Sequence, residues 1–114
     1  MAKAEIVLGE LSGGGGGDRK AYVVQAPTSN IINCGFQATK VYYSDPNYNT
    51  SHKIICIYDT EIDSANYVQR YDSSASIENN TGAYPFVTIG VTSVTIDSAY
   101  YNKMSANAVV AVIE

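Results

Sequence analysis

The chain has 114 residues, a formal net charge of −4, 46% hydrophobic residues and 16% charged residues. This length corresponds to one domain with enough apolar residues for a packed core, which excludes a second catalytic domain and a disordered chain. Eleven Val and eleven Ile stand against two Leu, and ten Tyr against no Trp, so the composition favours strands and excludes a helical bundle. The seven Lys and Arg are scattered and form no basic stripe, so we expect no nucleic-acid partner.

Short apolar runs recur roughly every eight to twelve residues with turn residues between them, which is typical of a sandwich or barrel. The pattern predicts about eight strands, at Ala4–Leu11, Lys20–Ala26, Thr39–Ser44, Lys53–Asp59, Asn66–Asp72, Phe86–Gly90, Ser93–Asp97 and Asn107–Ile113. Gly, Pro and Asn adopt the backbone angles of turns, so breaks are expected at Gly13–Gly17, Pro27–Asn30, Asp45–Asn47 and Asn79–Gly82. The segment Ser98–Ala106 has room for one helical turn.

We therefore expect an all-β fold, a single antiparallel β-sandwich of the jelly-roll or Ig-like kind, formed by residues 1–114 as one domain. Residues 1–19 are expected to form an N-terminal strand and arm, with a flexible Gly-rich loop at 13–17. Consecutive glycines lose much backbone entropy when ordered, so this run is either a mobile linker or a close passage against another chain. It lacks the spacing of a phosphate-binding loop and leads into a β-patterned segment, so we expect no nucleotide.

Two predicted strands are apolar on both faces. Every residue of Ile54–Ile57 is apolar, and so is every residue of Ala108–Ile113. A sheet with one solvated face would carry polar residues at every second position, so these strands are expected to be covered on both sides. The second cover is either a neighbouring subunit or loops of the same chain.

The N-terminus and the cysteines indicate the cellular compartment in which the chain folds. Glu5, Gly9 and Glu10 interrupt the apolar stretch that a signal peptide needs, and no apolar run reaches the length of a membrane-spanning helix. We expect a chain folded in a cytoplasm, without membrane insertion. Cys34 and Cys56 either pack as reduced thiols or form a disulfide after release into an oxidising medium.

Catalytic and metal-binding patterns are sparse. His52 falls in a predicted loop, and nothing in the sequence pairs it with a cysteine as base and nucleophile. Asp59, Glu61 and Asp63 alternate and suggest a Ca²⁺ site, although they do not fit an EF-hand, and a solvated strand end is the ordinary explanation. We expect no catalytic residue, no cofactor and no metal, and therefore a protein that is not an enzyme.

Tyrosines gather in or beside polar loops, where an exposed ring provides a large contact area at low entropic cost. The alternative at each position is a ring that caps the core with its hydroxyl in water. The candidate surface-recognition residues are Tyr42, Tyr48, Tyr67, Tyr84, Tyr100 and Tyr101.

The opening Met1–Gly14, the central Cys34–Tyr43, and the closing Val91–Ile96 and Ala108–Val112 together resemble small virion structural proteins of tailed bacteriophages. In that group a Gly-Phe-x-Pro-Lys-x-Val-like step enters a core strand, a later strand carries a Gly-Phe-Thr-like turn, and a final apolar strand closes the sandwich. Here Ala38 and Thr39 stand where Pro and Lys are usual, and Val91 stands where Phe is usual.

The resemblance implies a non-enzymatic subunit on the phage surface, made in the host cytoplasm: a capsid decoration or head-fibre subunit, or alternatively the tip domain of a tail fibre. It implies contacts with other virion proteins, a homo-oligomer that is a trimer in many such proteins, and a host-surface glycan or protein as a further partner. The candidate anchoring residues are then Ile6, Leu8, Gly13, Gly14, Gly15, Gly16 and Gly17. A cellular carbohydrate-binding module is the alternative from another class, and the lack of Trp argues against it.

Overall fold

The computed structural model describes residues 5–11, 19–61, 67–71, 77–81 and 86–114, and of residues 8–11, 67–71 and 77–81 it describes the backbone alone. These residues form ten strands and one short helix. In chain order they are β1 (Ile6–Leu11), β2 (Ala21–Gln25), β3 (Ile31–Asn33), β4 (Lys40–Tyr48), β5 (His52–Asp59), β6 (Tyr67–Tyr71), β7 (Ile77–Thr81), β8 (Val87–Ile89), β9 (Ser93–Ile96), α1 (Ser98–Tyr101) and β10 (Val109–Ile113).

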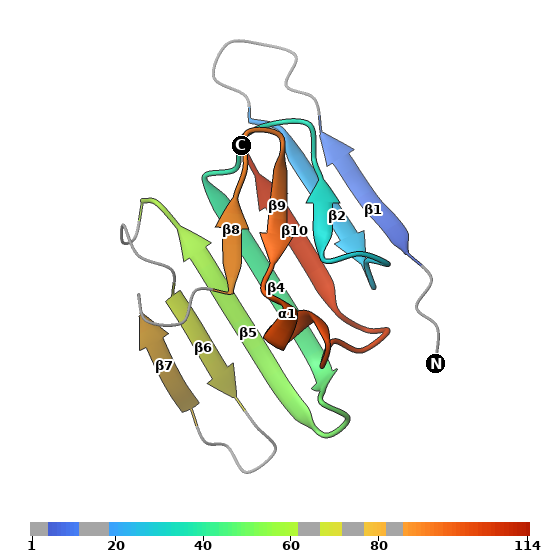
Figure 1. The fold of residues 1–114 in the computed structure, drawn as a ribbon, viewed down its shortest axis with the longest axis vertical. Coiled ribbons are helices and arrows are strands. Elements are labelled where there is room, and N and C mark those ends of the chain that lie inside the picture. Colours follow the sequence, from blue (N-terminus) through green and yellow to red (C-terminus); the bar gives the residue numbers. More distant parts are fainter. Residues whose placement is uncertain (1–4, 12–18, 62–66, 72–76, 82–85) are drawn as a thin grey trace.

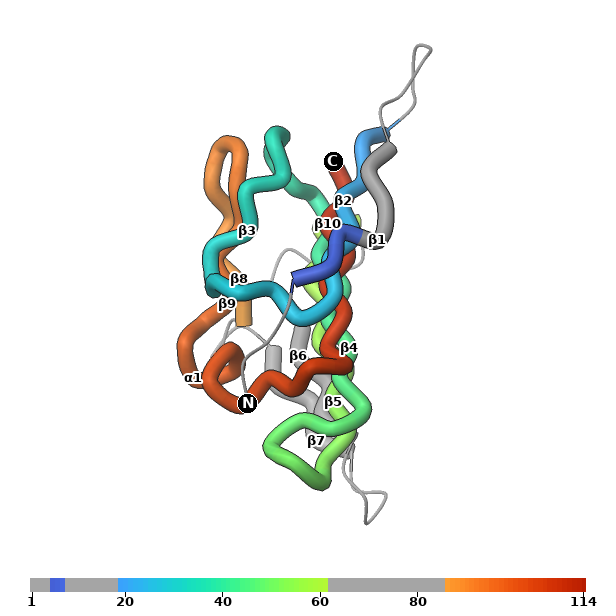
Figure 2. Tube along the Cα trace, turned by 90° about the vertical axis from the view of Figure 1, so that its right-hand side faces the viewer, coloured from blue at the N-terminus to red at the C-terminus, as the bar shows by residue number. Residues whose placement is uncertain are grey.

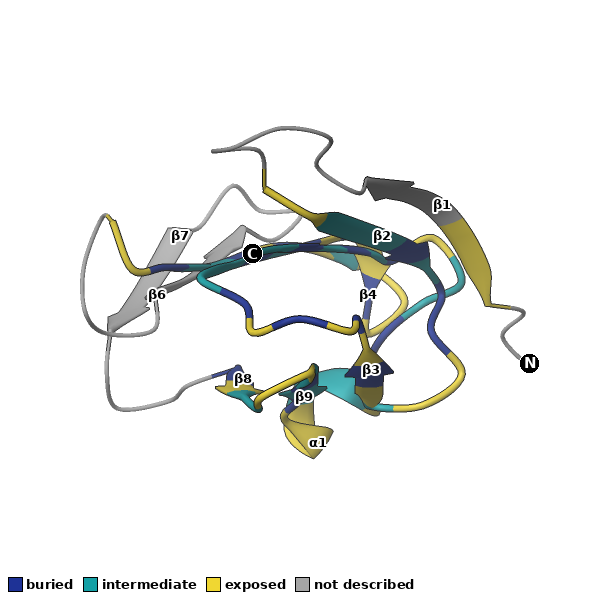
Figure 3. Ribbon diagram, turned by 90° about the horizontal axis from the view of Figure 1, so that it is seen from above, coloured by how far each residue is buried: buried dark blue, intermediate teal, exposed yellow. Residues whose placement is uncertain are grey.

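The strands form two antiparallel sheets that face each other (Figures 1 and 3). The larger sheet has seven strands in the order β1-β2-β10-β4-β5-β6-β7, and the smaller has three in the order β3-β9-β8. The predicted all-β antiparallel sandwich is confirmed. The division of seven to three is more uneven than in an immunoglobulin domain or a jelly roll.

All eight predicted strands have a counterpart, and β3 and β7 are additional strands that the pattern did not predict. The predicted break at Asn79–Gly82 is wrong over 79–81, which belong to β7. The predicted break at Asp45–Asn47 is wrong as well, because β4 continues to Tyr48. A shift of register between Asp45 and Tyr48 accommodates Pro46, which cannot donate to the ladder. The predicted helical turn is confirmed as α1, whose first turn is capped by the Asp97 side chain accepting from the Ala99 N–H.

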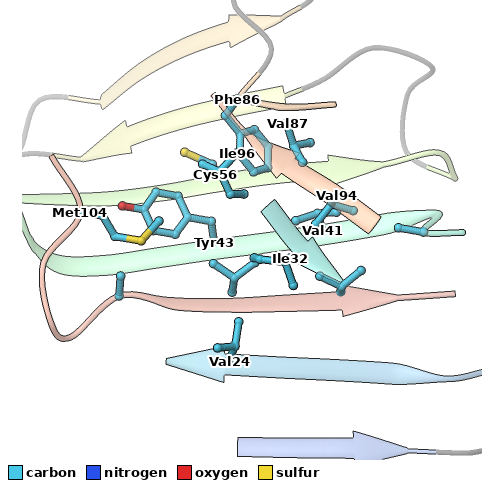
Figure 4. Packing of buried hydrophobic residues seen from close by; sticks show 14 of the residues in the cluster. Val24, Ile32, Val41, Tyr43, Cys56, Phe86, Val87, Val94, Ile96 and Met104 are labelled. Carbon is cyan, nitrogen blue, oxygen red and sulfur yellow. The ribbon is translucent and has the colours of Figure 1, made fainter. Parts of the chain in front are cut away.

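The hydrophobic core lies between the two sheets (Figure 4). The larger sheet contributes Val24, Val41, Tyr43, Ile54, Cys56, Val110 and Val112, and the smaller sheet and its flanks contribute Ile32, Phe86, Val87, Val94 and Ile96. Most of these residues are β-branched, which explains why a core can form with so little Leu.

The C-terminal strand β10 occupies the middle of the larger sheet, between β2 and β4. Val110 lies opposite Val24 on one side and Tyr43 on the other, and all three side chains are fully buried. This position explains the apolar character of β10, since a central strand packs against neighbours on both flanks and on its inner face.

Candidate functional site

One face of the larger sheet points away from the core, and no element among the described residues lies against it (Figures 2 and 3). Side chains alternate along a strand, so the burial of Val110 and Val112 places the other residues of β10 on this second face. We call it the outer face and define it by Val23, Tyr42, Ile55, Ile57, Val109, Ala111 and Ile113.

The outer face carries apolar side chains on four adjacent strands, with Gln25 and Ser44 among them. The register places Ala111 between Val23 and Tyr42, and Ile57 follows Tyr42 in the same row. A second row runs from Val109 across Ser44 to Ile55.

The sequence predicted that the apolar strands are covered on both faces, and the structure shows which face is covered. The inner face is covered by the smaller sheet, and Val110 and Val112 are 0% exposed. On the outer face Ile55 is 48% exposed and Val109 and Ile57 are partly exposed. The described loops therefore do not supply the second cover.

A network of charges borders one end of the outer face. The Lys40 ammonium lies 3.0 and 3.2 Å from the two Asp59 carboxylate oxygens and 3.1 Å from Glu61. The Tyr42 hydroxyl donates to Asp59 over 2.9 Å, and Arg19 pairs with Glu61 at 2.7 Å. Positive and negative groups thus neutralise each other at this border.

The carboxylate of Asp59 is the centre of this network. Burial by itself would raise its pKa, but hydrogen bonds from the Glu61 N–H, the Lys40 ammonium and the Tyr42 hydroxyl outweigh burial and hold the pKa below its ordinary value. Asp59 is 5% exposed, so the expectation of a solvated strand end is wrong for this residue. Its oxygens are occupied by these donors, which argues against the Ca²⁺ alternative, and Asp63 lies outside the described residues.

The candidate anchoring residues lie only partly within the structure. Ile6 and its neighbour Val7 are each 48% exposed on β1, which pairs with β2 at one edge of the larger sheet. Leu8 belongs to β1, although its side chain is not described, and Gly13–Gly17 lie outside the described residues. The exposed apolar side chains on an edge strand are compatible with a contact to another chain.

The described candidate recognition tyrosines lie on the larger sheet and on α1. Tyr48 is 6% exposed, so its assignment to a recognition surface is wrong. The Tyr100 ring packs 6.4 Å from both the Tyr48 and Phe86 ring centres, and the Tyr101 hydroxyl donates to the Pro27 carbonyl over 3.0 Å. These partly buried rings cap the core, as in the alternative considered for each Tyr.

The other three candidate tyrosines have different outcomes. Tyr42 lies on the outer face, where it is partly exposed. The side chain of Tyr67 in β6 and the whole of Tyr84 lie outside the described residues.

The structure also shows a polar hollow that the sequence analysis did not identify. It has a volume of about 280 Å³ and lies where the β4–β5 turn approaches the segment after α1. We call it the polar hollow; its lining residues are Asn47, Asn49, Thr50, Asn102, Lys103, Met104 and Ser105. Its two walls are separated by more than fifty residues in the chain, so no local motif could have revealed it.

Asp45 joins the two walls from behind. It is 1% exposed and accepts hydrogen bonds from the Tyr43 hydroxyl, the Asn47 N–H, and both the N–H and the hydroxyl of Ser105. A buried carboxylate is tolerated here because these donors replace its water shell.

Cys34, Cys56 and His52, the residues considered for nucleophilic chemistry, do not line this hollow. Cys34 and Cys56 are buried free thiols, which agrees with the reduced alternative, and burial raises the pKa of the Cys56 thiol. His52 is partly buried beside the Ser51 hydroxyl. Among the described residues, no group of His, Cys, Asp and Glu is arranged to hold a metal ion.

Comparison with protein-family models, with curated proteins and with solved structures finds no match to this chain. Within the described part of the chain, no helix has the length and apolar character that crossing a bilayer requires. The features of this chain that bear on its function are the outer face, the polar hollow and the resemblance of the sequence.

Proposed function

We propose that the protein is a non-enzymatic structural subunit that assembles with copies of itself through the outer face. The observation that carries this proposal is the apolar surface on the central strands of the larger sheet, which the described chain does not cover. Large apolar patches on a soluble domain mark interaction surfaces, because leaving them in water is unfavourable.

A second copy of the same sheet can pack on the outer face. The four strands that carry the outer face, about 4.8 Å apart and about five residues long, span a footprint of roughly 19 by 17 Å. This footprint is about 320 Å² before side-chain relief is added, so a standard interface of about 800 Å² per partner would also include residues that flank the outer face. Two such faces pack with their side chains interdigitated at a sheet spacing of about 10 Å.

The charge network at the border of the outer face favours a second copy of the chain over a strongly charged partner. The Lys40 ammonium and the Arg19 guanidinium are already paired with Asp59 and Glu61, so this border offers little excess charge to an oppositely charged protein. Beside Ile55, a hollow of about 230 Å³ lined by Pro46 and Lys53 can receive an apolar side chain from the partner. Interfaces often place an anchoring side chain in such a pocket.

The resemblance to small virion structural proteins supports the surface of a tailed-phage particle as the place of assembly. We propose a capsid decoration or head-fibre subunit, with the tip of a tail fibre as the alternative. The exposed Ile6 and Val7 on β1 support a contact between the N-terminal strand and another virion protein.

The assembly proposal is tested by the mass of the full chain in solution, measured by light scattering over a range of concentrations. Ile55→Lys places a charge on the outer face, and Ile31→Lys is the matched control because Ile31 is 49% exposed on the smaller sheet and Ile55 is 48% exposed. We expect an oligomer for the wild type and for Ile31→Lys, and a monomer for Ile55→Lys. A monomeric wild type, or an oligomer that Ile55→Lys leaves intact, would refute assembly through the outer face.

The place of assembly is tested with a phage that lacks the gene. Loss of physical stability of the particle supports decoration, and loss of adsorption supports a fibre tip. Particles with unchanged stability and adsorption would contradict both assignments.

A further inference from the structure

We propose that the polar hollow binds one saccharide residue, a ligand rich in hydroxyl groups. This site is separate from the outer face and goes beyond the assembly role. It lies at the end of the sandwich where β4 turns into β5, close to α1 (Figure 1).

The lining groups match the hydrogen-bonding capacity of sugar hydroxyls. The amides of Asn49 and Asn102 each offer donors and an acceptor, and a hydroxyl is likewise both donor and acceptor. Lys103 adds an ammonium donor to the same rim. Within the described part of the chain, no hydrogen bond engages these three side chains, so they are available to a ligand.

The charge of the hollow favours a polyol over an anion. Lys103 is the one cation in its lining, and the carboxylate of Asp45 behind it is occupied by four donors. A phosphate or a nucleotide would gain little from a single exposed ammonium. A ligand recognised through amides and hydroxyls fits the lining better.

The walls of the hollow are held together before any ligand binds. The Asn49 N–H donates to the Lys103 carbonyl over 2.8 Å, and the Asn107 amide donates to the Asn47 side-chain oxygen over 2.7 Å. The bonds from Ser105 to Asp45 add a buried connection. A site whose geometry is already set loses less entropy on binding.

The backbone at the rim is in an unusual conformation. Asn49 has a φ of 50° and Thr50 a φ of 70°, in the left-handed region, which a β-branched residue rarely adopts. Here the Thr50 N–H donates to the Asn47 carbonyl over 3.0 Å and holds the turn. Such outliers concentrate at binding sites, where the surrounding structure imposes them.

The size and floor of the hollow limit the ligand. A volume of about 280 Å³ is close to the lower end of small-molecule pockets, which suits one sugar ring and not a long chain. Met104, 6% exposed, lies in the floor and belongs to the core cluster with Tyr43 (Figure 4). Its apolar side chain can contact the C–H face of a ring while the amides engage the hydroxyls.

The test uses the isotope-labelled full chain and records amide shifts by NMR during separate titrations with glucose, galactose and N-acetylglucosamine. Glycerol serves as a small polyol control. We expect at least one sugar to shift the backbone signals of 49–50 and 102–105 in a saturable manner. The double variant Asn102→Ala/Lys103→Ala should weaken this binding about tenfold, since each lost hydrogen bond contributes a few-fold.

The matched control is Lys20→Ala/Asn33→Ala, which removes an exposed ammonium and an exposed amide elsewhere and should leave the affinity unchanged. Asn102→Asp preserves the shape of the side chain and removes its donors, so it serves as a second variant. Absence of shifts with all three sugars, equal shifts with glycerol, or unchanged binding by the double variant would each overturn the proposal. None of these variants touches the outer face, so the mass measured by light scattering reports on assembly independently.

Discussion

Replacement of Asp45 by Ala should be among the most destabilising single changes in the chain. The carboxylate is 1% exposed and accepts four hydrogen bonds, two of them from the backbone N–H groups of Asn47 and Ser105. Each buried donor left without an acceptor costs about 1–3 kcal/mol, so we expect a loss of about 3–5 kcal/mol. This is a large part of the stability of a small domain, which is about 5–15 kcal/mol.

The assay is urea unfolding at neutral pH, with Asp97→Ala as the control. Asp97 is an exposed helix cap that accepts one hydrogen bond from the Ala99 N–H, and its removal should cost about 1 kcal/mol. With an m-value of about 1.5 kcal/mol per M, the midpoint of Asp45→Ala should fall by about 2–3 M, and that of Asp45→Asn by less because one acceptor oxygen is kept. If Asp45→Ala loses no more stability than Asp97→Ala, the reasoning about the buried connection is refuted.

Two further predictions concern the charged border and the two faces of β10. Because its folded-state pKa is lowered, the Asp59 carboxylate stabilises the fold above its ordinary pKa of 3.8, and this contribution is lost as the pH falls through the lowered value. The melting temperature should therefore fall less for Asp59→Asn than for wild type between about pH 6 and pH 2, and parallel curves would contradict the assignment. Val110→Ala should lower the free energy of unfolding by about 2 kcal/mol, because the core loses packed methyl groups. Val109→Ala on the outer face should lower it by well under about 1 kcal/mol in the dissociated chain. Equal losses in chemical unfolding would contradict the orientation of β10.

Some features of the candidate site were readable from the sequence and others were not. The apolar run at Ala108–Ile113 predicted a strand that needs cover on two faces, and the structure shows that the smaller sheet covers one of them. The polar hollow was not predictable, because Asn49 and Lys103 meet only after β4, α1 and β10 have been placed. Tyr48 was misassigned for the same reason. It lies in a polar stretch of the sequence, but its ring packs against the ring of Tyr100, which is distant in the chain.

The carboxylates show this limit most clearly. Asp45 stands beside Pro46 and Asn47, a combination typical of a turn, yet it lies inside a strand and is buried against Ser105, sixty residues away. Asp59 follows an apolar run and suggests a solvated strand end, but the antiparallel register brings Lys40 directly opposite. In both cases the partner comes from a distant segment of the chain and leaves no local signal.

The sequence by itself determined that the chain forms an antiparallel sandwich, because β-branched composition, alternation and turn residues act between neighbouring residues. Only the tertiary structure decided that β10 enters between β2 and β4, that the strands divide seven to three, and which apolar face lies outside. Those choices depend on contacts between residues far apart in the chain, which are selected by the packing of the whole core and not by the preference of any one segment.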